Sequence, residues 1–383
     1  MKNYSVKKKY FKRYFAETGN ILLEKKIASS GKNRTISKGS ATMRPTLTQV
    51  AKKAGVKVSS ASEILNQRKN CWSSQATRER VFAAAKELGY RPNQTARSLR
   101  SGKTKTLGVI ITSHEYSYRM AGLDQAAYAR KYAVILTFNA NSPAMEDQLI
   151  LNHMDRGVDG LIVYPSDSGP HTELRKLVEQ GFPVVTFNGV GLDFECDDVS
   201  PDYICVGRLQ ARHLLEIGRR RICIATTTPS ALINSIREKG IRRELQEHGL
   251  QKPLTFNIKY ADDKESQSSE ILYPQILEFI TRHNGEFDSI IAFDSIATMA
   301  ARAILENGLR IPEDVSIVAA GNNILSSHGI LPLTSIDTSD EWIGMKAFEL
   351  VTDRIDGKLP KNKLERIISS SNLIIRQSTV KKV

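Results

Sequence analysis

Residues 46–66 read Thr-Leu-Thr-Gln-Val-Ala-Lys-Lys-Ala-Gly-Val-Lys-Val-Ser-Ser-Ala-Ser-Glu-Ile-Leu-Asn. Apolar residues recur at helical spacing on both sides of a glycine: Leu47, Val50, Ala51 and Ala54, then Val58, Ala61, Ile64 and Leu65. Ala51 is small enough for a second helix to cross closely, and Gly55 can adopt the left-handed conformation that a tight turn needs. The stretch predicts two short helices with the form of a helix-turn-helix, although an ordinary helical hairpin has the same pattern.

The residues that follow favour the helix-turn-helix. Ser74 is a typical N-cap for a third helix, whose apolar face repeats at helical spacing up to Leu88. A polar, basic stretch then leads into a strand-like segment that begins near Leu107. We therefore expect a small headpiece over residues 43–102, followed by a separate core over residues 103–383.

Five short motifs carry a resemblance to a known family: Val50-Ala-Lys-Lys-Ala-Gly-Val56, Thr77-Arg-Glu-Arg-Val81, Gly89-Tyr-Arg-Pro-Asn93, Ala96-Arg-Ser-Leu99 and Leu107-Gly-Val109. In order and nearly in spacing they resemble the headpiece of the lactose/galactose repressor (LacI/GalR) family, and the resemblance continues more weakly to about residue 378. It implies a transcriptional regulator, in most members a repressor, that binds a near-palindromic DNA operator as a homodimer. A small-molecule effector would control it.

The resemblance also implies which residues contact DNA. Four side chains at the start of the second helix would face the bases, three would hold phosphates, and further contacts would come from the first N-cap and the hinge. These residues are, in that order, Lys57, Val58, Ser59 and Glu63; Ser60, Ser62 and Asn66; Thr46; and Asn93, Ala96 and Leu99. Phosphate contacts fix the register on the duplex, and base edges carry the sequence information.

Two of these positions depart from the family. Lys57 stands where a serine or threonine usually caps the recognition helix, so the cap must be weak or come from elsewhere. Glu63 stands where an arginine commonly reads guanine. A carboxylate accepts from a cytosine amino group, which is one reading, and a solvated position beside a lysine is the other.

The segment Arg91–Arg100 resembles the family's hinge helix. Pro92 suits a first helical position, where its missing N–H is not needed. The resemblance implies that Leu99 wedges into a minor-groove step with Ala96 packed beside it. A buried core position for Leu99 does not fit, because residues 95–105 are polar and basic.

Charge is unevenly distributed along the chain. Residues 1–44 hold 12 Lys and Arg against 2 acids, and residues 45–105 hold 13 against 3. The whole chain carries +14, so residues 106–383 carry −6. A basic head on a mildly acidic body is typical of a nucleic-acid binder. We expect residues 1–42 to be a disordered basic extension. The alternatives are an amphipathic helix over residues 10–26 with added phosphate contacts, or an upstream start that the cell does not use.

From residue 106 onward strand and helix patterns alternate, which predicts parallel sheets covered by helices. The strands are expected at Leu107–Thr112, Val134–Phe138, Gly160–Tyr164, Pro183–Phe187, Ile222–Thr226, Ser289–Phe293 and Val315–Ala319. The expected fold class is α/β: an N-terminal helix-turn-helix headpiece with a hinge helix, then two doubly wound parallel sheets. The sheets would lie on either side of about residue 200, in a two-lobed core that resembles periplasmic binding proteins, with a ligand cleft between the lobes.

We expect three effector-binding residues, Ser113, Arg237 and Asp294. The resemblance points to Arg237 and Asp294, whereas Ser113 would rebuild the wall of the cleft where the family's Asn-Pro-Phe-Phe segment is missing. Arg237 lies three residues before Gly240, as does the family's arginine that grips effector hydroxyls or carboxylates. Gly321, however, replaces an acid that often binds sugar hydroxyls. We therefore expect simple hexoses to bind poorly and an anionic or differently shaped ligand to be preferred, or else the cleft to bind nothing.

Several classes of function find no support in the sequence. There is no nucleophile elbow and no phosphate-binding loop, so we expect neither an enzyme nor a bound cofactor. The four cysteines have no metal-ligand spacing and fit reduced thiols in a cytoplasmic protein. No apolar run is long enough for a membrane helix. The other readings are a regulator controlled by a protein partner or by nothing, and a soluble small-molecule binding protein.

Overall fold

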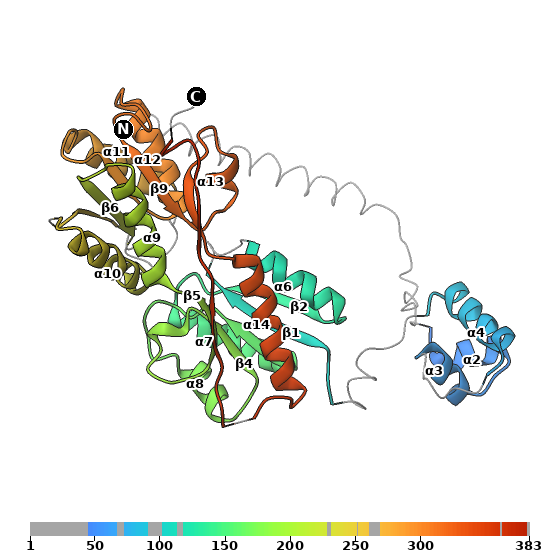
Figure 1. Cartoon of the computed structure of the whole chain (residues 1–383). Coiled ribbons are helices and arrows are strands. Elements are labelled where there is room, and N and C mark those ends of the chain that lie inside the picture. The colour runs from blue at the N-terminus through green and yellow to red at the C-terminus, as the bar shows by residue number, and fades with distance from the viewer. Residues whose placement is uncertain are drawn as a thin grey trace, which may run out of the picture. The chain divides into compact units, whose positions relative to one another are not determined.

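The computed structural model describes residues 45–66, 73–90, 102–112, 118–227, 231–250, 252–259, 269–360 and 362–380. The chain divides into two compact units, residues 1–93 and 94–383, both drawn in Figure 1. The boundary expected after residue 102 lies nine residues further along the chain. The extension predicted over residues 1–42 lies outside the described residues, as does the hinge segment.

The N-terminal unit contains three helices, α2 (Leu47–Ala54), α3 (Val58–Leu65) and α4 (Gln75–Glu87). Their apolar faces form one small core, made of Val50, Ala51, Ala54, Ala61, Ile64, Val81, Ala84 and Ala85. Alanines dominate this core, so the three helices pack closely. The predicted helical pattern and its serine cap are confirmed, because the Ser74 side chain accepts a hydrogen bond from the Thr77 amide.

The second unit contains two six-stranded sheets. The first has the order β11 (Arg366–Ser369), β5 (Asp197–Pro201), β4 (Val184–Phe187), β3 (Gly160–Val163), β1 (Thr106–Ile111) and β2 (Ala133–Phe138). The second has the order β12 (Asn372–Ile374), β10 (Thr334–Asp337), β9 (Ser316–Ala320), β8 (Ser289–Ile291), β6 (Ile222–Thr227) and β7 (Leu254–Ile258). All recorded pairings are parallel except β10 with β12.

Helices pack against both sheets to make two lobes (Figure 1). The first lobe has α6 (Tyr118–Ala129), α7 (Pro143–Asp155), α8 (Thr172–Glu179), the short 3-10 turn η1 (Gly189–Gly191) and α14 (Asp340–Ile355). The second lobe has α9 (Tyr203–Glu216), α10 (Ala231–Glu247), α11 (Ser269–Arg282), α12 (Asp294–Glu306) and α13 (Ile324–His328). The two-lobed α/β core expected from the sequence is confirmed.

The chain crosses between the lobes three times, after β5, after β10 and after β11. The sequence analysis placed the sheets simply before and after about residue 200, which is incomplete. After β10 the chain returns to add α14 and β11 to the first lobe, and only then does β12 join the second (Figure 1). Since the first two crossings leave from carboxyl ends of parallel strands, these ends of both sheets lie at the junction of the lobes.

Buried apolar contacts and one ion pair fix α14 on the first lobe. Ala347, Phe348 and Val351 belong to the same buried cluster as the strands β1 and β4. Arg354 at the end of the helix makes two bonds to the Asp197 carboxylate of β5, Nε–Oδ2 at 2.6 Å and Nη2–Oδ1 at 2.8 Å. Because the two bonds are parallel and mostly buried, they hold the end of the helix against β5 with a defined orientation.

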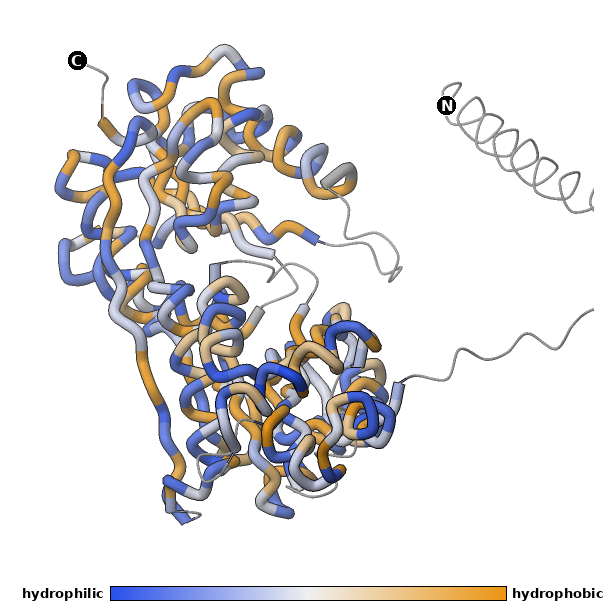
Figure 2. Tube along the Cα trace, turned by 90° about the vertical axis from the view of Figure 1, so that its right-hand side faces the viewer, coloured by the Kyte–Doolittle hydropathy of each residue, from blue (hydrophilic) through white to orange (hydrophobic). Residues whose placement is uncertain are grey.

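The hydropathy colouring in Figure 2 shows apolar and polar stretches alternating along the chain. Each predicted strand is present, and its ends differ from the expected ones by at most two residues. In the described part of the chain, no helix combines the length and the apolar character needed to cross a membrane. Cys196, Cys205 and Cys223 are not in disulfides, and Cys71 lies outside the described residues.

Candidate nucleic-acid interface and interlobe cleft

A capping box and a left-handed glycine fix the turn between α2 and α3. The Thr46 Oγ1 accepts from the Gln49 amide at 3.3 Å, and the Gln49 Oε1 accepts from the Thr46 amide at 2.7 Å. Gly55 has φ 67° and ψ 38°, and the Val56 amide donates to the Ala51 carbonyl at 3.0 Å. This is the conformation that glycine tolerates best, so the chain turns sharply and α3 crosses α2.

The face of α3 that points away from the headpiece core carries the predicted base-reading residues. Lys57, Val58 and Ser59 are exposed, and Glu63 is partly exposed one turn further along. Val58 leaves 43% of its surface exposed although it is apolar. Lys57 makes no side-chain cap hydrogen bond, which is expected because lysine stands here in place of the usual serine or threonine cap. The first turn of α3 therefore has amide groups that its own N-cap does not satisfy.

The predicted phosphate contacts lie along the same helix. Ser60 and Ser62 are partly buried, and the side-chain Nδ2 of Asn66 donates to the Ser62 carbonyl at 2.6 Å. Within the described residues Glu63 makes no recorded ion pair, and its side chain is partly exposed. Asn93, Ala96 and Leu99 lie outside the described residues, as does Ser113.

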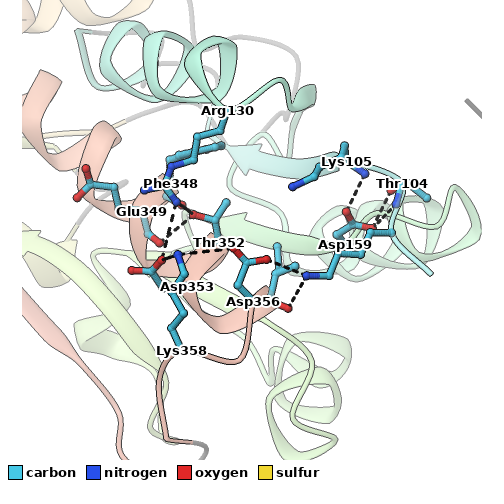
Figure 3. Close-up of polar contacts among 12 residues, drawn as sticks. Thr104, Lys105, Arg130, Asp159, Phe348, Glu349, Thr352, Asp353, Asp356 and Lys358 are labelled. Atoms are coloured by element: carbon cyan, nitrogen blue, oxygen red, sulfur yellow. Dashed lines mark hydrogen bonds and ion pairs between the residues drawn. The ribbon is translucent and has the colours of Figure 1, made fainter. Parts of the chain in front are cut away.

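The first described residues of the core are anchored to the first lobe (Figure 3). The Asp159 carboxylate accepts from the Thr104 amide at 2.7 Å, the Thr104 hydroxyl at 2.9 Å and the Lys105 amide at 2.8 Å. Lys103 Nζ donates to the Asp356 carboxylate at 2.8 Å. We call Thr104, Lys105 and Asp159 the entry clamp. It fixes the point where the chain from the headpiece enters the core.

Arg237 is fully buried in the second lobe. Its guanidinium lies over the Phe293 ring at 4.3 Å and donates to the Gln210 Oε1 at 3.1 Å and the Asn234 Oδ1 at 3.3 Å. All three neighbours are neutral, and Nε has no recorded partner. Burial lowers the pKa of this guanidinium to about 10.

Asp294 is also buried, and the protein itself occupies both of its carboxylate oxygens. Oδ1 accepts from the Ser335 hydroxyl at 2.9 Å and Oδ2 from the Asn323 amide at 2.7 Å. Burial raises the pKa of this carboxyl to about 6, although these hydrogen bonds act in the opposite direction. At Gly321, where φ is 117°, an added Cβ would lie 2.9 Å from Asp294 Oδ2. The Asp294 carboxylate therefore fills the space that a side chain at position 321 would need.

A small cavity of about 20 Å³ lies where the lobes meet. It is lined by His171, Asn188 and neighbouring residues at the carboxyl edge of the first sheet, and by Leu232 and Ile233 of α10. The buried His171 ring contacts the Glu146 carboxylate at 2.8 Å, and Asn188 Oδ1 has no recorded partner. This space holds about one water molecule, so an organic ligand does not fit in it.

Sequence reasoning missed several residues of this region. Phe293, Gln210 and Asn234 surround Arg237, and Asn188 lines the small cavity at the junction of the lobes. Gln210 also donates to three strand carbonyls, so it is held rigidly. A signal was available for Phe293 alone, because it ends the apolar strand pattern over residues 289–293 and α12 begins at the next residue.

Comparison with known proteins identifies the two units. Residues 46–93, which contain the turn between α2 and α3, match the family described as bacterial regulatory proteins, lacI family. The chain is 28% identical over 342 residues to the HTH-type transcriptional repressor PurR of Vibrio atlanticus (strain LGP32), which covers 88% of this chain and 98% of PurR. The chain belongs to the lacI family of bacterial regulatory proteins.

The core of this lacI-family protein matches as well. Residues 211–379 match the periplasmic binding protein-like domain. The ribose operon repressor of Escherichia coli (strain K12) is 26% identical over 81% of this chain and 93% of its own length. These relatives are transcriptional repressors, which are not enzymes. Family membership makes this chain a DNA-binding transcriptional regulator with a sensor-type core.

Solved structures agree with this architecture. The lac repressor dimer bound to operator and the anti-inducer ONPF aligns over 88% of this chain and 99% of that one, with a TM-score of 0.74 and 23% identity. The transcriptional regulator CelR in complex with cellobiose aligns with a TM-score of 0.63 and 26% identity, over 88% of this chain and 100% of that one. The fold of the lacI-family regulator is thus that of known regulators across both units.

Proposed function

We propose that this lacI-family regulator is a repressor that binds a near-palindromic operator as a homodimer and responds to a small molecule in its core. One observation carries the proposal. The capped α2, the left-handed Gly55 and the exposed polar face of α3 form a helix-turn-helix in which the second helix is free to enter a major groove. One headpiece reads few base pairs, so two copies related by symmetry are needed for a specific site.

In this proposal the first turn of α3 reads bases. Lys57 donates to guanine acceptors, Val58 packs against a thymine methyl group, and Glu63 accepts from a cytosine amino group. Each of these side chains is exposed or partly exposed on the face away from the headpiece core. Ser59 also faces the groove in this arrangement.

The remaining contacts position the headpiece on the duplex. We assign phosphate binding to Ser60, Ser62 and Asn66, with Thr46 at the start of α2. The hinge residues Asn93, Ala96 and Leu99 would contact the minor groove, with Leu99 as the wedge. These assignments are part of the proposal. The proposal also includes the domain limits, with residues 43–102 as the DNA-binding headpiece and residues 103–383 as the core.

A selected-oligonucleotide experiment on the full-length chain tests operator binding. We expect a two-fold symmetric motif, and a Kd for the selected duplex that is at least about a thousandfold below the Kd for random DNA of equal length. Val58→Asp should remove the preference, because it places a carboxylate in the groove. Gln75→Asp, at an exposed position of α4, is the control and should keep the preference. A motif without symmetry, or equal affinity for random DNA, would refute the proposed function.

Exposed apolar side chains on the second lobe support the homodimer. Ile324 and Leu325 of α13 leave 64% and 45% of their surfaces exposed, and the nearby Ile330 is fully exposed. Grouped apolar residues of this size are unusual on a monomer and fit a contact with a second copy. Sedimentation of the Ile324→Arg and Ile330→Arg double variant should show a monomer where the unaltered chain is a dimer. A double variant that remains dimeric would exclude this surface as the contact.

We further propose that the core binds its small molecule without converting it, and that the protein acts in the cytoplasm, where its DNA target is. Arg237 is the central ligand contact in this proposal, and Ser113 is assigned as a further contact. Asp294 contributes by shaping the wall, because its oxygens are already bonded to Ser335 and Asn323. The melting temperature of the ligand-free chain, compared with its melting temperature in the presence of each compound of a metabolite panel, tests whether a ligand exists. If no compound raises the melting temperature but a protein extract does, control by a protein partner replaces the proposed control by a small molecule.

A further inference from the structure

A second cavity, with a volume of about 620 Å³, lies beside the start of α6 and the start of α14. Pockets that bind small molecules commonly measure about 300–1,000 Å³. Both lobes contribute to its walls, since α6 and α14 belong to the first lobe and α13 to the second. Among the described residues, neither Arg237 nor Asp294 lines this cavity, and it shares no lining residue with the small cavity beside Ile233. The larger cavity is therefore distinct from the proposed Arg237 site.

The wall from the first lobe is rigid, because α6 and α14 cross with their backbones in contact. A Cβ added at Gly122 would lie 1.8 Å from the Glu341 carbonyl oxygen. A Cβ added at Gly344 would lie 1.7 Å from the Arg119 carbonyl oxygen. Real Cβ atoms do not approach an oxygen this closely, so only glycine permits this crossing. The first turn of α14, which carries Glu341 and Trp342, is thus held in place before any ligand arrives.

The apolar side chains of the cavity come from the same two helices. Trp342 and Met345 are three residues apart on α14, so they share one face of that helix, and Tyr118 stands at the start of α6. Tyr118 is exposed, and the other two are partly exposed. Aromatic and thioether groups in this state offer an organic molecule apolar surface to cover. The cavity therefore suits a ligand with an apolar part rather than a bare ion.

Arg376 is the cationic group of the cavity. Its Nη1 donates to the Leu333 carbonyl at 2.8 Å and its Nη2 to the Asn322 Oδ1 at 2.6 Å, and both acceptors are neutral. No carboxylate of the described residues forms an ion pair with it. A guanidinium has five N–H donors, so donors remain for a further acceptor. A carboxylate matches the fork of this group and is the acceptor that it binds best.

Asp337 and Glu341 are the acidic groups without an ion pair in the described part of the chain. The Asp337 Oδ1 accepts from the Ser339 amide at 2.9 Å, and its Oδ2 accepts no recorded hydrogen bond there. Glu341 is exposed and has no recorded side-chain partner among the described residues. The cavity therefore presents both a cation and acids whose charges are not paired within the protein.

The cation and the nearer acid are a short distance apart. The Ser335 Oγ accepts from the Asn322 amide at 3.1 Å, and the Asn322 side chain in turn binds Arg376. Asp337 follows Ser335 by two residues on β10, so both side chains leave the same face of the strand about 6.6 Å apart. A molecule that bridges Asp337 and Arg376 therefore needs a cationic and an anionic group only a few bonds from each other.

We propose that this cavity binds a free amino acid with an apolar side chain. Its ammonium group pairs with Asp337, with Glu341 at the rim, and its carboxylate binds Arg376. Its side chain covers Trp342. A ligand with charge of one sign would leave a protein group of the same sign facing it, whereas a zwitterion satisfies both. This site goes beyond the proposed function, because its ligand is separate from the one assigned to Arg237.

Calorimetric titration of the full-length chain with three molecules of one skeleton tests the charge pattern. The probes are phenylalanine, phenethylamine, which lacks the carboxylate, and 3-phenylpropanoate, which lacks the ammonium group. Phenylalanine should bind at least about tenfold more tightly than either, since each charge-assisted hydrogen bond contributes about this factor. An amine or an acid that binds as tightly as phenylalanine would overturn the proposal. So would a Kd above about 1 mM for both phenylalanine and leucine.

Two variants should remove this preference one end at a time. Asp337→Asn should reduce the preference for phenylalanine over 3-phenylpropanoate to within about threefold, and Arg376→Gln should do the same for the preference over phenethylamine. Asp155→Asn, at an exposed acid that ends α7, is the matched control and should keep both preferences. An unchanged preference in folded Asp337→Asn refutes the assignment. If that variant does not fold, Glu341→Gln should weaken phenylalanine at least about threefold, and an unchanged Kd refutes it.

Tryptophan fluorescence locates the bound amino acid. The chain has two tryptophans, Trp72 and Trp342, so Trp72→Phe leaves Trp342 as the reporter. Phenylalanine should change the emission of Trp342 and protect it from quenching by acrylamide. Adding Arg237→Gln should leave the Kd for phenylalanine within about threefold. Unchanged emission at saturation, or loss of binding in Arg237→Gln, would place the amino acid outside this cavity and overturn the proposal.

Discussion

Replacing Asp159 by asparagine should loosen the entry clamp, and the structure sets the size of the effect. The carboxylate accepts three hydrogen bonds, two from backbone amides and one from a hydroxyl. An asparagine oxygen can keep the two bonds from Thr104, but its NH₂ group then faces the Lys105 amide, which loses its acceptor. A hydrogen bond to a charged group contributes about 1.5–3 kcal/mol, and partial solvent exposure favours the lower end. We expect the core to lose about 2 kcal/mol of unfolding free energy.

Thermal unfolding of the full-length protein measures this loss. A change of 1 kcal/mol shifts Tm by roughly 2–4 °C in domains of 150–250 residues, so Asp159→Asn should lower the Tm of the core by roughly 4–8 °C. Asp124→Asn is the matched control. Asp124 is an exposed acid of the same lobe with no recorded hydrogen bond, and its replacement should change stability by less than about 0.5 kcal/mol. An unchanged Tm in the Asp159 variant would refute the energetic role of the clamp.

The Asp159→Asn variant also gives an upper limit for the loss of operator affinity that a loosened clamp should cause. Between the headpiece and the first described residue of the core lie the 11 residues 91–101, and release of residues 102–105 extends this connection to 15. For a simple tether the effective concentration of the headpieces would then fall by a factor of about 1.6. Operator affinity should therefore fall less than about twofold. A tenfold loss would refute the tether estimate and make the clamp part of the signal between core and headpiece.

Three further predictions follow from other parts of the molecule. Gly344→Ala should lower the free energy of unfolding of the core by about 2 kcal/mol or more in urea, because the added Cβ would lie 1.7 Å from the Arg119 carbonyl oxygen. The gain in helix propensity, ~1 kcal/mol, does not offset this clash. A variant that is equally or more stable would contradict the close crossing of α6 and α14. Asp294 has a folded pKa raised from 3.8 to about 6, so the native state holds the extra proton and stability falls as pH rises from about 4 to 6. Asp294→Asn should remove roughly 3 kcal/mol of this pH dependence, and parallel pH profiles for both proteins would count against it. Glu63→Arg should shift the selected base at one position per half-site toward guanine by roughly 1–3 kcal/mol, whereas an unchanged motif places Glu63 in solvent.

Local patterns made the headpiece and most strands predictable from the sequence. The spacing around Val50 and Ala51, the turn at Gly55 and the cap at Ser74 each act within a few residues, and the structure retains all of them. The seven predicted strands were found for the same reason, since buried parallel strands are short apolar runs between helices. The sequence analysis missed β5, β7, β10, β11 and β12.

Long-range partners were not predictable in this way. Nothing in the sequence near Asp340 indicates that α14 returns to the first lobe, because its partners on α6 lie more than 200 residues earlier. The bonds of Asp294 to Ser335 and Asn323 are likewise set by sheet order rather than by spacing.

The late return of the chain to the first lobe has a consequence for the protein during its synthesis. The strand β5 ends at Pro201 and its neighbour β11 begins at Arg366, so 164 residues must be added before that sheet edge is paired. At about 5–20 residues per second the ribosome needs roughly 8–33 s for this length. During that interval β5 is an open edge, and the apolar surface later covered by Phe348 and Val351 is bare. The first lobe is thus the first to be translated and among the last to be finished, and a nascent chain of about 340 residues is the form most in need of a chaperone.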